Sequence, residues 1–188
     1  MNDSRTAEQA TLREVIRLGH PVLRATAEAV PEEWLDSGRL QALCRDMSAT
    51  MLEEDGVGLA APQIAESLRL FTYWVPGSGD EPEITPRALV NPEIKAVGEE
   101  LEEGWEGCLS IPGLRGVVPR YRRIKVRALS PQGETLSFTA DGFHARVIQH
   151  ELDHLDGVVF LDRMLSSRSL AFEEEWERYV LGLGEDDD

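Results

Sequence analysis

Residues 141–157 read DGFHARVIQHELDHLDG, and this stretch predicts the helix around which the fold is built. Its apolar residues recur at helical spacing, and Gly157 is typical of the position just past a helix C-terminus. At about 100° per residue, His150, Glu151 and His154 fall within one arc of about 100°. Two histidines at this spacing can share a metal ion, and the glutamate can reach a water beside it. The stretch therefore predicts a helix that carries part of a hydrolytic metal site.

The same projection places Phe143 and Val147 on the face of the two histidines, one to two turns earlier. We expect these side chains to border the metal as the wall of an apolar pocket, although such a face also packs into ordinary cores. Asp153 projects away from this face and is expected to be solvated or to support a ligand from outside. His144 lies at the edge of the face and is expected to be structural.

Two histidines do not complete a metal site, and the sequence offers two sources for a third ligand. Cys108 stands in WEGCLSIPG at 105–113, and a thiolate binds zinc or ferrous iron strongly. The glutamates at 173–175 follow His154 by about twenty residues, a spacing at which a glutamate completes some zinc peptidases. Spacing alone does not separate a cysteine-ligated hydrolase from a zinc endopeptidase.

The segment GVGLAAPQI at 56–64 contains a single polar side chain, Gln63. Its glycines and alanines allow the backbone to approach a ligand closely. The glycine spacing differs from that of a phosphate loop, so nucleotide binding is not expected. A tight turn in which Gln63 bonds a backbone group is the simpler structural interpretation.

The remaining patterns predict an α+β fold, with antiparallel β-sheets packed around the central metal-binding helix. Helical spacing marks 38–53, where Cys44 belongs to the buried stripe and is expected to be an unreactive core thiol. We also expect a short helix at the start of 11–24, ending around residues 19–21, and a C-terminal helix over 167–181. The expected strands are 68–75, 88–97, 121–129 and 135–139.

The chain has 188 residues, with 35 acidic and 19 basic side chains and a net charge of −16. This length suits one catalytic domain over 1–188. The acidic balance opposes binding to DNA and to anionic membranes, and no apolar run approaches the ~18 residues of a membrane-spanning helix. The N-terminus lacks the features of a secretory signal, and two cysteines cannot build a disulfide framework. A cytoplasmic protein is therefore expected.

The charge is unevenly distributed along the chain. Residues 173–188 hold eight acids and one base and are expected to form a solvated helix with an acidic tail. In contrast, the stretch 115–127 holds six cations among alternating apolar residues, which predicts a strand with one basic face and a candidate site for an anionic partner. These cations are Arg115, Arg120, Arg122, Arg123, Lys125 and Arg127.

Three short motifs in fixed order resemble the signature of the peptide deformylase family: GVGLAAPQ at 56–63, EGCLS at 106–110 and QHELDHLDG at 149–157. The similarity extends over about 15–165 and leaves 166–188 as an acidic C-terminal helix and tail. The resemblance implies a metal-dependent hydrolase that removes the N-formyl group from the N-terminal formylmethionine of nascent proteins and releases formate.

The resemblance also implies the metal and the catalytic groups. The metal ligands would be Cys108, His150 and His154. They would hold one divalent ion, Fe²⁺ in the cell and Zn²⁺, Ni²⁺ or Co²⁺ in other preparations. Glu151 would move the proton of the attacking water. The Gln63 amide and the backbone N–H of Leu109 would hold the oxyanion.

Further residues match substrate-binding positions of the family. Val57, Phe143 and Val147 would line the formylmethionine pocket, and Gly58 and Gly107 would pair with the peptide backbone as an added strand does. Glu106 is a further expected substrate-binding residue, and Arg115 matches a position near the downstream end of the peptide.

One feature departs from the family pattern. Several members end in a basic helix that docks on ribosomal RNA, whereas this chain ends in an acidic one. The expected partners are therefore formyl-Met nascent peptides, with any ribosome association made without a basic C-terminal helix.

Overall fold

The computed structural model describes residues 10–77, 79 and 82–183. Its helices are α1 (Gly38–Glu53), α2 (Gly142–Leu155), α3 (Phe160–Arg163) and α4 (Glu173–Tyr179), with 3₁₀ turns at Pro21–Arg24, Glu32–Trp34, Ala61–Ile64 and Ser167–Ser169. Its strands are β1 (Gly58–Ala60), β2 (Leu70–Val75), β3 (Ile84–Ala96), β4 (Leu101–Cys108), β5 (Ile111–Tyr121), β6 (Arg123–Leu129), β7 (Thr135–Asp141) and β8 (Ala171–Phe172).

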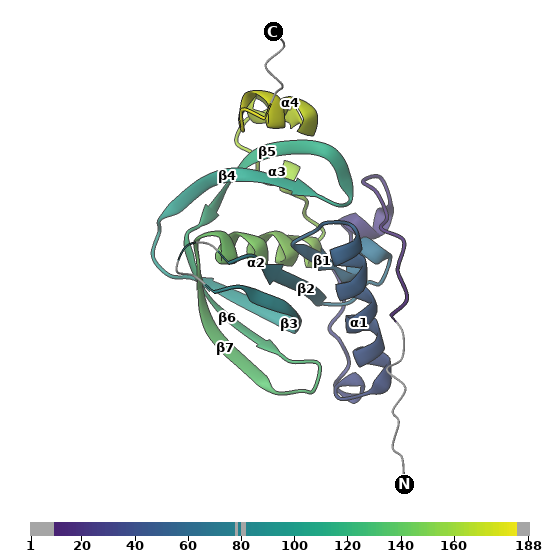
Figure 1. Cartoon of the computed structure of the whole chain (residues 1–188). Helices are drawn as coiled ribbons and strands as arrows, with labels where there is room; N and C mark the ends of the chain where they lie inside the picture. Colours follow the sequence, from purple (N-terminus) through teal and green to yellow (C-terminus); the bar gives the residue numbers. More distant parts are fainter. Residues whose placement is uncertain (1–9, 78, 80–81, 184–188) are drawn as a thin grey trace.

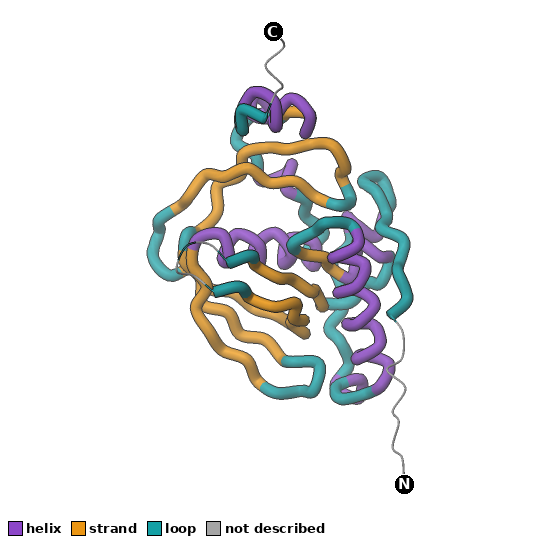
Figure 2. Tube along the Cα trace, viewed as in Figure 1, coloured by secondary structure: helices purple, strands orange, loops and turns teal. Residues whose placement is uncertain are grey.

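The strands form two antiparallel sheets that enclose α2. The larger sheet has the order β1-β2-β3-β6-β7, and the smaller one has the order β4-β5-β8. Figure 1 shows α2 between the two sheets, with α1 along the side of the larger one. Figure 2 shows the same arrangement by element type. The predicted α+β class, its central helix and a C-terminal helix are all confirmed.

Helix α2 is held in place by its apolar face. Ala145, Ile148 and Leu155 are fully buried and pack in one cluster with Phe71 and Val126 of the larger sheet. This burial fixes the rotation of the helix, because turning it would expose three apolar side chains to water. The opposite side of α2 is therefore directed toward the smaller sheet.

The sequence pattern located α1 and the end of α2 correctly. The Ser37 hydroxyl accepts a hydrogen bond from Leu40 N–H at the start of α1. Cys44, on the buried face of this helix, packs in the hydrophobic core as expected. After α2, Gly157 adopts a φ of +73°, the left-handed conformation that favours glycine past a helix C-terminus.

The short helix expected to end around residues 19–21 is wrong, because residues 10–20 hold no helix and the 3₁₀ turn at Pro21–Arg24 begins only where that helix was expected to stop. The segment before it is extended and bonds to α1 instead of to itself. Thr11 N–H donates to Asp46, and the Arg13 guanidinium pairs with the same carboxylate. These tertiary bonds replace the local ones that a helix would supply.

The C-terminal helix is shorter than the predicted 167–181. Ser166 accepts a hydrogen bond from Arg168 N–H and starts a 3₁₀ turn, after which β8 pairs with β5. Helix α4 begins only at Glu173, where three successive glutamates favour a helix N-terminus. Among the described residues, no helix is long and apolar enough to cross a membrane.

The single basic strand expected over 115–127 is wrong. A break between Tyr121 and Arg123 separates β5 from β6, so the cations belong to two different sheets. Four of the six form ion pairs, and the predicted anion-binding face is thus largely neutralised. The pairs are Arg115–Glu173, Arg120–Glu106, Arg122–Glu100 and Arg123–Asp141. Strand β4 and residues 111–114 of β5 were not predicted as strands.

Candidate active site

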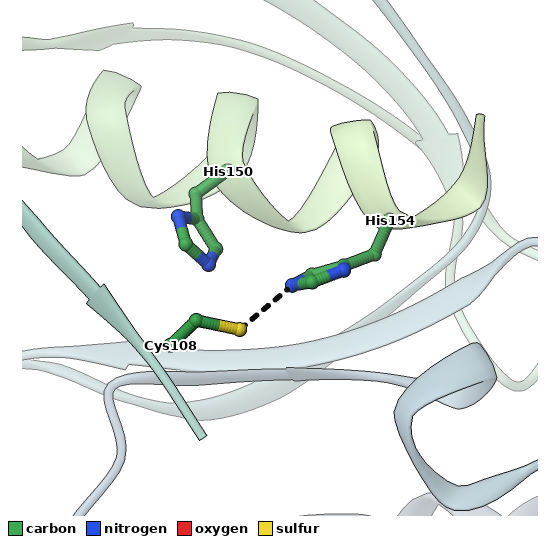
Figure 3. A group of neighbouring side chains, drawn as sticks. All are labelled: Cys108, His150 and His154. Carbon is green, nitrogen blue, oxygen red and sulfur yellow. Dashed lines mark hydrogen bonds between the residues drawn. The ribbon is translucent and has the colours of Figure 1, made fainter. Parts of the chain in front are cut away.

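Helix α2 and the end of β4 bring three potential metal ligands together. His150 and His154 project from successive turns of α2, and Cys108 faces them from the last residue of β4 (Figure 3). One ligand atom from each residue lies within 4.8 Å of the others, and Cys108 Sγ lies 3.3 Å from His154 Nε2. The two histidines expected to share a metal thus meet the thiol, although Cys108 and His154 are 46 residues apart.

The donor set fits a divalent transition metal. A thiolate and two imidazoles suit Zn²⁺ or Fe²⁺, and three protein ligands leave coordination positions for water or substrate. His154 is fully buried, and this burial lowers its pKa well below the usual value, so the ring remains neutral as a metal ligand requires. The residues present therefore fit the metal that the sequence predicts.

Glu106 orients the His150 ligand. Its Oε2 lies 2.9 Å from His150 Nδ1, which leaves Nε2 directed toward the cysteine and the second histidine. The other oxygen, Oε1, accepts hydrogen bonds from Arg120 and Arg146. Burial raises the pKa of Glu106, but its hydrogen bonds to His150 and Arg120 outweigh this and lower the pKa well below the usual range. The carboxylate therefore stays charged and holds a ligand ring in place.

Two arginines in this network were not predicted as site residues. Arg120 lies between Glu106 and Asp153, and Arg146 bonds Glu106 together with backbone oxygens of β4 and β5. Asp153, expected to project away from the metal face, is buried and also binds Arg163. A charged Arg146 within the buried stretch 145–149 was an available signal, because a buried guanidinium requires charged or polar partners.

Glu151 lies beside the metal ligands and is buried. Its side chain is 3% exposed, and its Oε2 is buried without a hydrogen-bond partner among the described residues. Burial raises the pKa of Glu151 to about 7, against the opposing effect of His150. A carboxyl group with a pKa near neutrality can both accept and return a proton.

The absence of a side chain at Gly58 makes room for this carboxylate. A Cβ atom at residue 58 would lie 2.1 Å from Glu151 Oε1. The backbone of β1 thus runs directly past the Glu151 carboxylate, which explains one of the glycines in the 56–64 segment.

Gln63 is fixed with its amide nitrogen toward the metal ligands. Its Oε1 accepts a hydrogen bond of 2.8 Å from Ala60 N–H, and its Nε2 lies 3.4 Å from Cys108 Sγ and 3.2 Å from Ser110 Oγ. The expected bond from Gln63 to a backbone group is present. The same bond orients the amide N–H group toward the site.

A cavity of about 490 Å³ opens beside these groups. Phe143 and Val147 line it next to His150 and Glu151, as the helical projection predicted. Eight further candidate residues also line this cavity: Val57, Gly58, Gln63, Glu106, Gly107, Cys108, Leu109 and Arg115. His144 is outside this lining and bonds the Tyr73 hydroxyl.

The glutamate alternative for the third ligand is not assembled. Glu173 pairs with Arg115 instead, and the group of close ligand atoms found among the described residues consists of Cys108, His150 and His154. The site thus combines a cysteine and two histidines with a buried carboxylate and an adjoining cavity. These features define a candidate hydrolytic metal centre in an α+β fold.

Comparison with known proteins identifies the family. The family model for polypeptide deformylase matches residues 12–169, and the chain belongs to this family. "Peptide deformylase 2" of Nostoc sp. is 43% identical over 169 residues, which cover 88% of this chain and 93% of the relative. "Peptide deformylase 1" of Xanthomonas axonopodis pv. citri is 46% identical over 166 residues, covering 87% and 96%.

Solved structures of peptide deformylases have a similar fold. The Met-Ala-Ser-bound class I type b peptide deformylase from Acinetobacter baumannii superposes with a TM-score of 0.78 at 39% identity, over 83% of this chain and 100% of that one. The peptide deformylase from Thermotoga maritima gives a TM-score of 0.75 at 38% identity, over 83% and 99%.

Proposed function

We propose that this chain removes the N-formyl group from the N-terminal formylmethionine of nascent proteins and releases formate. The observation that carries the proposal is the meeting of Cys108, His150 and His154 beside a buried Glu151 and an open cavity. Membership of the polypeptide deformylase family supports the same reaction.

Cys108, His150 and His154 would hold one divalent ion, which we propose is Fe²⁺ in the cell, with Zn²⁺, Ni²⁺ or Co²⁺ as substitutes. The ion, when bound, acts as a Lewis acid that polarises the formyl carbonyl and acidifies water. Glu106 supports this centre by holding the His150 ring through Nδ1. We therefore assign Glu106 to positioning the His150 ring, in place of the substrate-binding role expected from the sequence.

Glu151 accepts the proton of the attacking water and delivers it to the leaving amine. Its burial favours this role, because a pKa of about 7 lets the group take up and release a proton at physiological pH. The Gln63 amide and the backbone N–H of Leu109 would donate to the oxygen of the tetrahedral intermediate. The bond between Gln63 and Ala60 N–H orients this amide before substrate arrives.

The peptide would lie between two strand edges that border the cavity. Strand β1 is the edge of the larger sheet and β4 is the edge of the smaller one, with Gly58 and Gly107 in the cavity lining. Backbone groups at such edges can pair with an extended peptide. Val57, Phe143 and Val147 would then surround the methionine side chain.

The proposed substrate places the enzyme where translation occurs, in the cytoplasm. The acidic C-terminal helix and the net charge of −16 oppose docking on ribosomal RNA through that helix. Segment 171–179 packs on β5 beside the cavity, which supports treating the whole chain as one catalytic domain.

The direct test measures formate release from a formyl-Met peptide, with enzyme loaded anaerobically with Fe²⁺ and separately with Zn²⁺. We expect formate with both metals and a loss of about 10²–10⁴-fold in the Glu151→Ala variant, with its metal retained. Glu174→Ala is the matched control, since Glu174 is exposed and distant from the ligand cluster. No formate under either metal would refute the proposal.

A further inference from the structure

The C-terminal segment contributes a charged side chain to the substrate cleft. Strand β8 pairs with β5 so that Ala171 stands opposite Arg115. Glu173 follows two residues later, and its carboxylate Oε1 accepts hydrogen bonds from Arg115 Nε (2.9 Å) and Nη2 (2.5 Å). Both Arg115 and Glu173 line the cavity that adjoins the metal ligands.

Arg115 reaches the cavity by crossing the neighbouring strand at a glycine. A Cβ atom at Gly107 would lie 3.1 Å from the Cδ, Nε and Cζ atoms of Arg115. Gly107 directly precedes the ligand Cys108, so the guanidinium lies close to the path of a peptide leaving the metal. An extended chain rises about 3.3 Å per residue, which brings its first few residues within reach of this group.

The guanidinium is held from two sides. Its carbon lies 4.9 Å from the centre of the Trp176 ring, and Trp176 packs in turn against Trp105, with 6.2 Å between ring centres. Glu173 occupies the edge of the guanidinium formed by Nε and Nη2, and hydrogen bonds between two charged groups are stronger than neutral ones. Glu54 and Asp55 add further negative charge to the cavity lining.

We propose that Glu173 is a specificity-determining residue that occupies Arg115 and so prevents the cleft from favouring peptides with a carboxylate near their formyl end. The inference rests on the proposed deformylase function. At this distance the main chain of a continuing polypeptide is a neutral peptide group, whereas that of a short free peptide ends in a carboxylate. With Glu173 bound to Arg115, the cleft does not bind a short peptide with a free carboxylate more strongly than a continuing polypeptide.

The test compares two substrates that differ only in terminal charge, formyl-Met-Ala-Ser with a free carboxylate and the same peptide with a C-terminal amide. The measured quantity is the ratio of kcat/KM for the acid to that for the amide. In Glu173→Gln we expect this ratio to rise by about three- to fivefold, through KM of the acid and with kcat unchanged, as for a newly available exposed ion pair. The rise should shrink at 0.5 M salt, because ionic screening weakens such a pair.

Glu174→Gln is the matched control, because it removes the same charge from the neighbouring exposed position outside the cavity lining. Its ratio should equal that of the wild type. Adding Arg115→Gln to Glu173→Gln should return the ratio to the wild-type value, which identifies the guanidinium as the responsible group.

A Glu173→Gln ratio that changes no more than the Glu174→Gln ratio would overturn the inference, and so would a rise that persists in the double variant. A lowered melting temperature without a change in ratio would show a purely structural pair, and would overturn it as well. Failure of the proposed function looks different, since the wild type would then release no formate from either peptide.

Discussion

Replacing Gly58 by alanine tests how strictly the position of Glu151 limits catalysis. The new Cβ would lie 2.1, 2.5 and 2.8 Å from Oε1, Cδ and Cγ of Glu151, so the oxygen has to move by about 1.3 Å to reach an ordinary contact of 3.4 Å. Gly58 does not have a positive φ, and alanine can therefore adopt its backbone conformation without strain.

The expected loss follows from this displacement. A misplacement of about 1 Å in a catalytic group costs on the order of 10²-fold in rate, which corresponds to about 2.7 kcal/mol of barrier. We therefore expect kcat of Gly58→Ala to fall about 100-fold. Alanine keeps the N–H and C=O groups that would pair with the peptide, so KM should change by less than about threefold.

The assay is formate release at saturating substrate, together with metal content and a thermal melt. Gly38→Ala is the control variant, because a Cβ there meets no atom within 4 Å, and its activity should match the wild type. A Gly58→Ala variant that keeps more than a third of the wild-type kcat would contradict the predicted displacement of Glu151. Loss of the metal from this variant would contradict it as well, since residue 58 is not among the ligands.

Three further outcomes are expected. Cys108→Ala should abolish stoichiometric metal binding; a variant that retains the metal in a chelator competition would contradict the assigned ligand set. Burial raises the pKa of Cys44 from 9.0 to about 12, so its thiolate fraction at pH 8 is about 10³-fold lower than that of an ordinary thiol. In the Cys108→Ala variant, the Cys44 thiol should be alkylated more slowly in the native protein than in the urea-unfolded chain, by about this factor. Equal rates would contradict the predicted rise in the pKa of Cys44. Arg120→Met should lower the free energy of unfolding in urea by about 3 kcal/mol, because it strips a buried cation from Glu106 and Asp153; a loss below about 1 kcal/mol would count against the network.

Local patterns predicted the helical part of the site well. The bounds of α1 and the position of α2 follow from apolar spacing, and the lining positions of Phe143 and Val147 follow from the rotation of one helix. These features depend on residues within about four positions of one another, and helix geometry alone relates them.

Local patterns failed where long-range pairing replaced local bonding. In segment 11–18, Thr11 and Arg13 bond to α1, while the N–H groups of residues 16 and 18 donate to the backbone of Gln63 and Ser110. Strand β8 interrupts the expected C-terminal helix because it pairs with β5. The cations of 115–127 alternate like one strand, yet the chain turns between Tyr121 and Arg123 and enters a second sheet.

The common helical face of His150, Glu151 and His154 can be predicted from the amino-acid sequence, since the rise and twist of a helix fix that relation. The groups that lie opposite this face depend on the packing of the whole chain. Three features depend on how the two sheets close around α2. Cys108 approaches His154 across 46 residues, burial raises the pKa of Glu151, and Arg115 pairs with Glu173 across 58 residues. Burial and long-range pairing belong to the packed molecule, because no local rule of chain geometry brings such distant residues together.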